Sequence, residues 1–119
     1  MTVVYVAFGS ALGGVCRYLV SALLNSLAGF PWGTLGVNVL GSLAIGLISG
    51  WLAHGTGNVT AIRAFAVVGF CGGFTTFSTF SNEAFHMLEH SQWGMFAGYV
   101  AASLLAGFAA VGVGYFLSK

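Results

Sequence analysis

The sequence predicts an all-α integral membrane protein with four transmembrane helices. Hydrophobic residues make up 58% of the 119 residues, charged residues only 4%, and the mean hydropathy is +0.96. A water-soluble domain with so few charges would have almost no polar surface to present to the solvent. Four helices of about 20 residues fit this length with short loops, whereas the apolar and polar alternation of a β-barrel is absent.

The four spans are expected at about residues 2–24, 33–53, 61–88 and 93–117, within a single transmembrane domain over residues 1–119. Short loops are expected near residues 25–32 and 54–58. The cations Arg17, Arg63 and Lys119 provide no basic face for nucleic acid, and they give the loops little of the charge asymmetry that orients membrane proteins. Because the chain could insert in either orientation and four thin helices enclose little alone, we expect an antiparallel, dual-topology homodimer surrounded by membrane lipid.

The first span combines small residues with a charge. Gly9 and Gly13 have the four-residue spacing that lets two membrane helices approach closely. Arg17 lies in the same span, where a charge is costly unless it faces protein or water. It either finds a polar partner inside the protein or extends its long side chain to the nearer membrane interface, and both interpretations stay open.

The second span has a well-defined length. Trp32 and Trp51 bracket it at a separation that fits the two interfacial belts of a bilayer, and Gly46 and Gly50 repeat the packing spacing. Asn38 places a carboxamide within this span. An amide in hydrocarbon needs partners, so Asn38 either joins helices as a structural hydrogen-bonding group or lines a polar path.

The third segment is too long for one ordinary span. From Thr60 to His90 an unbroken helix would be about 46 Å long, well beyond the hydrocarbon thickness. The pair Gly72 and Gly73 falls near its middle, and each glycine weakens a helix by roughly 1 kcal/mol relative to alanine. We therefore expect a break near residues 72–76, caused by the glycines. Such a break is tolerated only where its backbone groups face protein or a water-filled cavity.

The two ends of such a break would bind opposite charges. Carbonyl groups from Gly72 to Thr75 could coordinate a small cation such as Na⁺. Amides and hydroxyls of Thr76, Ser78 and Thr79 could donate to an anion, and Thr75 or Thr76 could cap the second half-helix.

Aromatic residues follow the break at a spacing of three, which places Phe74, Phe77 and Phe80 in one stripe on a helix. One interpretation is a stripe that faces lipid or the core. The alternative is a narrow path, because the edges of aromatic rings carry positive partial charge and could solvate an anion without a fixed cation. Such walls suit a weakly held, mobile anion.

In the interior of the fourth span, Tyr99 and Ser103 lie four residues apart and hence present two hydroxyl groups on one side of the helix. They are either structural or part of a polar path.

Patterns typical of catalysis are absent from the sequence, which contains no Ser/His/Asp set, HExxH motif or glycine-rich phosphate loop. The titratable side chains cluster at the end of the third segment, where we interpret Glu83, His86, Glu89 and His90 as interfacial residues. We predict that the protein is not an enzyme.

Three motifs occur in order along the first three spans. They are Gly13-Gly14-x-x-Arg17-Tyr18, Gly33-Thr34-Leu35-x-Val37-Asn38-x-x-Gly41-Ser42, and Gly69-Phe70-Cys71-Gly72-Gly73-Phe74-Thr75-Thr76-Phe77-Ser78-Thr79-Phe80-Ser81. Together they resemble the motifs of the small bacterial fluoride channels, the Fluc or CrcB family, and the third is the most specific.

The resemblance implies an antiparallel homodimer in the bacterial inner membrane, with two pores at the dimer interface that export fluoride passively from the cytoplasm. It implies that Phe77 and Phe80 are the paired pore aromatics and that Asn38 is a pore-lining donor. It also implies that the carbonyl groups of Gly72 and Thr75 hold a structural Na⁺ on the dimer axis.

Further positions match vestibule or polar-track groups of the family, and Arg17 and Gly73 are expected to have structural roles. The matching positions are Arg17, Thr34, Thr79, Glu83, Tyr99 and Ser103. One departure is Gly107, which stands where some relatives have a second serine on the fourth helix; a shorter hydroxyl track, or one completed by water, would follow.

Two other functions compete with a channel. The first is a dual-topology small multidrug transporter, which resembles this chain in size but needs a carboxylate in the first helix, where only Arg17 is found. The second is a non-transporting subunit of a larger complex, which would need no polar break in the middle of the membrane.

Overall fold

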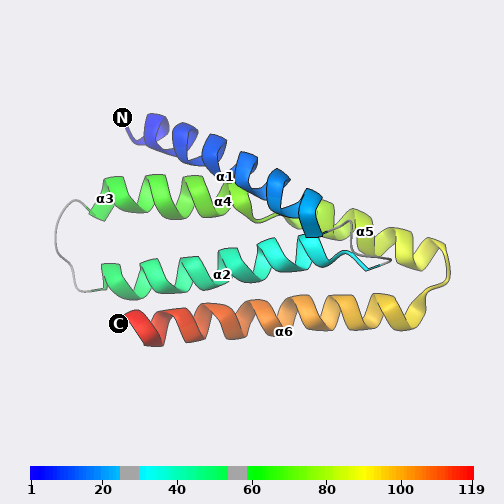
Figure 1. Cartoon of the computed structure of the whole chain (residues 1–119). Coiled ribbons are helices and arrows are strands. Elements are labelled where there is room, and N and C mark those ends of the chain that lie inside the picture. The colour runs from blue at the N-terminus through cyan, green and yellow to red at the C-terminus, as the bar shows by residue number, and fades with distance from the viewer. Residues whose placement is uncertain (25–29, 54–58) are drawn as a thin grey trace.

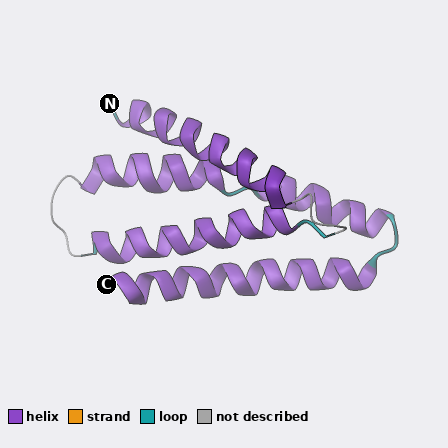
Figure 2. Ribbon diagram, in the orientation of Figure 1, coloured by secondary structure: helices purple, strands orange, loops and turns teal. Residues whose placement is uncertain are grey.

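The computed structural model describes residues 1–24, 30–53 and 59–119, and these residues form helices and no strand (Figures 1 and 2). Four helical segments are long and apolar enough to cross a membrane, at Thr2–Leu24, Trp32–Leu52, Val59–Glu89 and Trp93–Ser118. This confirms the all-α class with four spans, and the protein is a multi-pass membrane protein. The loops expected near 25–32 and 54–58 lie largely outside the described residues.

Three of the spans are single helices, namely α1 (Thr2–Leu24), α2 (Trp32–Leu52) and α6 (Trp93–Ser118). The third span is built from α3 (Val59–Ile62), the π-helix η1 (Arg63–Cys71), α4 (Gly72–Phe74) and α5 (Phe77–Glu89). With its longest dimension at 50 Å, the bundle exceeds the thickness of the hydrocarbon core, and both termini lie at the same end (Figure 1).

The helices pack as two pairs, with α1 along η1 and α4, and α2 along α6 (Figure 1). In the first pair the two backbones nearly touch. A side chain at Gly9 would collide with the backbone of Phe65 and lie 2.9 Å from the amide nitrogen of Phe70. In the second pair, a side chain at Gly46 would meet the backbone of α6 at Val111. Small residues at these positions therefore permit the close packing that their spacing predicted.

The break in the third span follows the glycine pair rather than coinciding with it. Gly72 has helical dihedral angles (φ −62°, ψ −38°), whereas Thr75 (φ −85°, ψ 157°) and Thr76 (φ −147°, ψ 120°) are extended. The predicted break near residues 72–76 is therefore confirmed, at Thr75 and Thr76, while Gly72 itself remains helical. Gly73 serves packing, since a Cβ there would lie 2.7 Å from the backbone oxygen of Ser10 in α1. The extended residues are β-branched threonines, which favour that conformation.

Few side chains are buried within one copy of the chain. Tyr99 and Thr34 are almost completely enclosed, at 0% and 1% exposure. Large apolar side chains are widely exposed, among them Phe77 at 78% and Phe108 at 77%. Exposed apolar surface of this kind is expected where lipid or another membrane-embedded chain covers it.

Candidate functional site at the helix break

Asn38 in α2 holds the chain at the break. Its Nδ2 donates a hydrogen bond to the carbonyl oxygen of Thr76 (3.1 Å), and the amide of Thr76 donates to Asn38 Oδ1 (2.8 Å). One carboxamide thus binds the carbonyl and the amide of the extended residue that precedes α5, and it supplies the acceptor that this amide would otherwise lack. Asn38 joins two helices, as the structural interpretation predicted, and it also lines the cavity described below.

Arg17 in α1 closes the other side of the break. Its Nε donates to the carbonyl oxygen of Gly73 (3.2 Å). In a continuous helix that carbonyl would accept from the amide of Phe77, which now belongs to the next helix. The guanidinium therefore replaces the missing donor and places a positive charge at the carbonyl end of a helix, where it is favourable. Of the two interpretations of Arg17, the polar partner inside the protein is confirmed.

The start of α5 is capped by Thr76, as predicted. The amide of Thr79 donates to Thr76 Oγ1 (3.2 Å). Without the break, this amide would donate to the carbonyl of Thr75, and the amide of Thr76 would donate to that of Gly72. Both amides are diverted, so the carbonyl oxygens of Gly72 and Thr75 have each lost their helical donor.

Phe77 and Phe80 lie together at the start of α5, with ring centroids 6.1 Å apart and an interplanar angle of 48°. Phe74 does not join them. It is buried before the break and stacks on Phe70 at a centroid distance of 5.9 Å. The predicted single stripe of three rings is therefore wrong for Phe74, because the two extended threonines end the helical repeat that would have aligned it.

A cavity of about 260 Å³ lies beside these rings, between the break, α2 and α6. It is lined by Asn38, Ser42, Ile45, Thr75, Thr76, Phe77, Phe80, Ser103, Leu104 and Gly107. Among the described residues that line it, none is charged. Ser103 Oγ is enclosed and has no hydrogen-bond partner among the residues the structure describes. A buried hydroxyl without a partner costs free energy, so Ser103 is available to bind a ligand in the cavity.

A second polar cluster adjoins Phe80. The hydroxyl of Tyr99 donates to Glu83 Oε1 (3.0 Å), and the enclosed side chain of Thr34 lies close to it. The Tyr99 ring contacts that of Phe80 at a centroid distance of 5.0 Å. Three of the predicted site residues thus form one group, separated from the cavity by the ring of Phe80.

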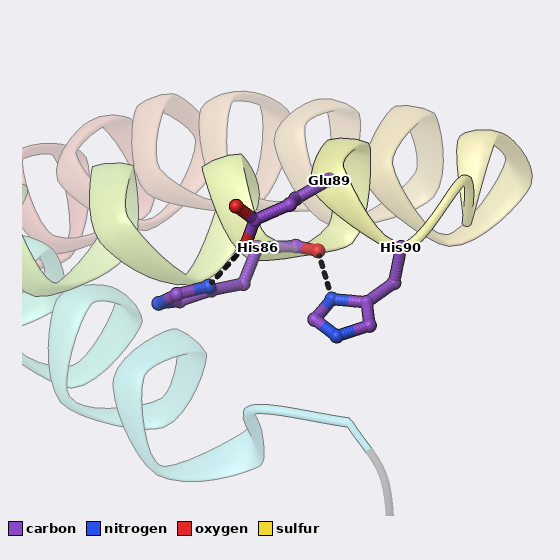
Figure 3. Close-up of polar contacts among 3 residues, drawn as sticks. All are labelled: His86, Glu89 and His90. Atoms are coloured by element: carbon purple, nitrogen blue, oxygen red, sulfur yellow. Dashed lines mark hydrogen bonds and ion pairs between the residues drawn. The ribbon is translucent and has the colours of Figure 1, made fainter.

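Glu83 also lines a larger cavity of about 420 Å³ at the end of α5. Its remaining lining residues are Phe30, Pro31, His86, Met87, His90, Gln92 and Met95. Figure 3 shows how the exposed polar groups there are paired: His86 Nδ1 lies 3.2 Å from Glu89 Oε1, and His90 Nδ1 lies 2.8 Å from the carbonyl oxygen of His86. All three side chains are exposed, as expected for residues near a membrane interface.

Most of the predicted pore residues lie either in the cavity beside Phe77 and Phe80 or in the polar cluster around Tyr99. Thr79 does not, and Ser42 joins the cavity although it was not predicted. Thr79 contributes its backbone amide to the cap, but its side chain is exposed and does not line the cavity of Phe77 and Phe80. Ser42 does line that cavity and was missed. It follows Asn38 by four residues in the same helix, a spacing that could have indicated a shared face.

Comparison with known proteins places these features in a family. Residues 4–115 match the family described as CrcB-like protein, Camphor Resistance (CrcB). The chain belongs to the CrcB-like family. This confirms the resemblance that the three motifs indicated.

Similar members of the CrcB-like family carry channel names. The chain is 46% identical over 102 residues to the "Fluoride-specific ion channel FluC 1" of Nitrobacter hamburgensis, covering 84% of this chain and 81% of that protein. It is 44% identical over 121 residues to the "Fluoride-specific ion channel FluC" of Agrobacterium fabrum (100% and 97%), and 39% identical over 122 residues to that of Bacteroides fragilis (98% and 95%). The family is one of ion channels, so the prediction that the protein is not an enzyme is confirmed.

Proposed function

We propose that this protein is a fluoride channel that lets F⁻ leave the cytoplasm passively across the bacterial inner membrane. The observation that carries the proposal is the cavity at the break, where the rings of Phe77 and Phe80 lie beside Asn38 and the hydroxyl of Ser103, which has no partner in the described part of the chain. The channel names of relatives that align over nearly the whole chain support it.

The lining of the cavity suits a small anion that must keep moving. Ring edges of Phe77 and Phe80 and the hydroxyl of Ser103 offer partial positive charge. Since the described lining contains no cation, the anion is held weakly enough to leave. Fluoride enters cells as an uncharged weak acid and dissociates inside, so the negative membrane potential drives the free anion out through a passive pore.

Two copies of the chain complete the site. Phe77 is 78% exposed in a single copy, and the cavity beside it contains polar groups that would face hydrocarbon without a cover. An antiparallel second copy would cover both, and each copy would then contribute one of two pores at the interface. The weak charge asymmetry of the chain permits this dual topology.

The break also fits a structural Na⁺. The carbonyl oxygens of Gly72 and Thr75 have lost their helical donors, whereas Arg17 occupies that of Gly73. Freed carbonyls at a discontinuous helix are ligands that Na⁺ prefers in membrane proteins. One copy offers two such groups, so the Na⁺ would lie where two copies meet and would join their broken helices. We expect the dimer to unfold at a higher temperature in Na⁺ than in N-methyl-D-glucamine; equal stability would argue against this site.

No contact favours the small multidrug transporter. Such a mechanism requires a free carboxylate in the first helix, and α1 offers Arg17, which is bonded to Gly73. Glu83, in the third span, is engaged by Tyr99.

Efflux from proteoliposomes tests the proposal. Vesicles loaded with fluoride and containing the purified dimer should release fluoride within seconds to minutes of adding a K⁺ ionophore, as recorded with a fluoride electrode, while chloride-loaded vesicles should retain chloride. A folded dimer that releases no fluoride would rule out the channel.

A further inference from the structure

A second cavity continues from the first along the groove between α2 and α6. It has a volume of about 240 Å³ and is lined by Ser42, Ser103, Leu104, Gly107, Phe108 and Val111. The first four of these residues also line the cavity of Phe77 and Phe80. The two cavities therefore adjoin, and Ser42 and Ser103 stand at their junction.

Ser42 presents its hydroxyl at this junction from the α2 side. Its Oγ would lie 3.7 Å from a Cβ atom at Gly107, and among the described residues no other atom outside the chain neighbours and the nearby backbone of α6 lies within 4 Å of that position. Gly107 follows Ser103 by one helical turn, just as Ser42 follows Asn38. The pair Asn38 and Ser42 on α2 thus faces the pair Ser103 and Gly107 on α6. Because Gly107 has no side chain, there is space next to the hydroxyl of Ser42.

Ser103 indicates that this space is suited to an anion. Its Oγ is enclosed and lacks a partner among the described residues. A desolvated fluoride ion needs several hydrogen-bond donors in place of its water shell, and a hydroxyl can rotate to supply one. Hydrogen bonds to a full charge are about twice as strong as neutral ones.

We propose that Ser42 is a fluoride-binding residue, which together with Ser103 holds the anion at a position beyond Phe77 and Phe80. The path then continues between α2 and α6 toward Phe108 and Val111. This inference rests on the proposed channel function and adds to it a binding residue from α2 that substitutes for the hydroxyl absent at Gly107.

Replacement of Ser42 by Thr and by Val separates the hydroxyl from the shape of the side chain. The two replacements have nearly the same shape, but only Thr keeps the donor. We expect S42T to retain at least half of the wild-type efflux rate and S42V to lose roughly tenfold or more. The matched pair S49T and S49V, seven residues later in α2 and outside both cavities, should both transport normally.

A rescue experiment excludes a merely structural role. In the S42A background, G107S places a new hydroxyl in the same space from the opposite wall, where a Cβ atom meets only ordinary contact distances. We expect S42A to lose efflux and S42A/G107S to recover most of it, with both proteins eluting as the wild-type dimer. Should S42V not fold, S42A and its rescue decide the matter.

The outcomes distinguish the two levels of the proposal. Wild-type efflux together with normal efflux in S42A or S42V would overturn the role of Ser42 and leave the channel intact. Loss of efflux in S42A without recovery in S42A/G107S would assign Ser42 to packing. Absence of efflux in the folded wild type would remove the channel function itself.

Discussion

The two sides of the break in the third span are built in opposite ways. On the carbonyl side, α4 lies against the backbone of α1, and Arg17 binds the carbonyl oxygen of Gly73. On the amide side, Asn38 holds Thr76, but the following ring of Phe77 is 78% exposed beside a cavity. The first side is packed against α1 and hydrogen-bonded at Gly73, whereas the second borders a cavity that is open to a ligand.

This difference is consistent with the proposal that one helix break binds a structural cation at one end and a passing anion at the other. A packed, hydrogen-bonded carbonyl end has the rigidity required to hold a structural cation. An amide end that meets a cavity lined by rings and hydroxyls provides weak, replaceable contacts for a passing anion. Variants on each side should therefore fail differently: those on the amide side in transport, and those on the carbonyl side in stability.

The largest effect is expected on the amide side, from Phe80→Ile or Phe77→Ile. Isoleucine fills a similar space but lacks a ring edge with positive partial charge, so fluoride efflux should fall to the background of empty vesicles. The purified variants should still elute as the wild-type protein does. Phe85→Ile is the matched control, because Phe85 is also exposed in α5 but does not line the cavity. Normal efflux in both test variants would show that the rings are not on the path.

On the carbonyl side, Gly73→Ala and Gly72→Ala form an internal comparison. A methyl group at Gly73 would lie 2.7 Å from the backbone oxygen of Ser10, whereas one at Gly72 would lie 3.8 Å from its nearest neighbour. We expect G73A to destabilise the protein by about 2–3 kcal/mol through overpacking and G72A to be nearly neutral. Thermal unfolding in detergent measures both. Equal effects would mean that the glycines act through flexibility instead.

Arg17→Met should cost less, because it removes a single hydrogen bond while keeping the apolar stem. The carbonyl of Gly73 then lacks its donor, which we expect to lower the free energy of unfolding by about 1–2 kcal/mol. Arg63→Met, at an exposed position, should leave the stability unchanged. If R17M unfolds at the wild-type temperature, the guanidinium does not stabilise the broken helix.

Sequence patterns predicted the helices well but not the way the break is made. The lengths of the hydrophobic segments predicted the four spans. The four-residue glycine spacings that begin at Gly9 and Gly46 predicted where the helices pack closely, because both patterns depend only on neighbouring residues in the sequence. The sequence predicts a break within residues 72–76 but not the contacts that stabilise it, because α1 approaches Gly73 and Asn38 reaches Thr76 from other helices. Both are contacts between residues far apart in the sequence.

The candidate site shows the same limit. The polar residues Asn38, Tyr99 and Ser103 could be named from the sequence, but their grouping could not. Tyr99 is bonded to Glu83 behind the ring of Phe80, whereas Ser103 faces the cavity. A spacing of four residues places two side chains on the same face of a helix. Which residues of other helices that face contacts depends on how the helices cross, and the sequence does not give this.

The smallest effect is expected at the amide end, from Thr76→Val. Thr76→Val removes the hydroxyl that accepts from the amide of Thr79 but keeps the β-branched shape that favours an extended backbone. Loss of this cap should cost about 1 kcal/mol in thermal unfolding, because Asn38 still holds the backbone of Thr76. Thr79→Val, whose side chain is exposed, is the control. A cost in T76V as large as that of G73A would mean that the amide end is as rigidly built as the carbonyl end, which would contradict the proposed division between a bound cation and a passing anion.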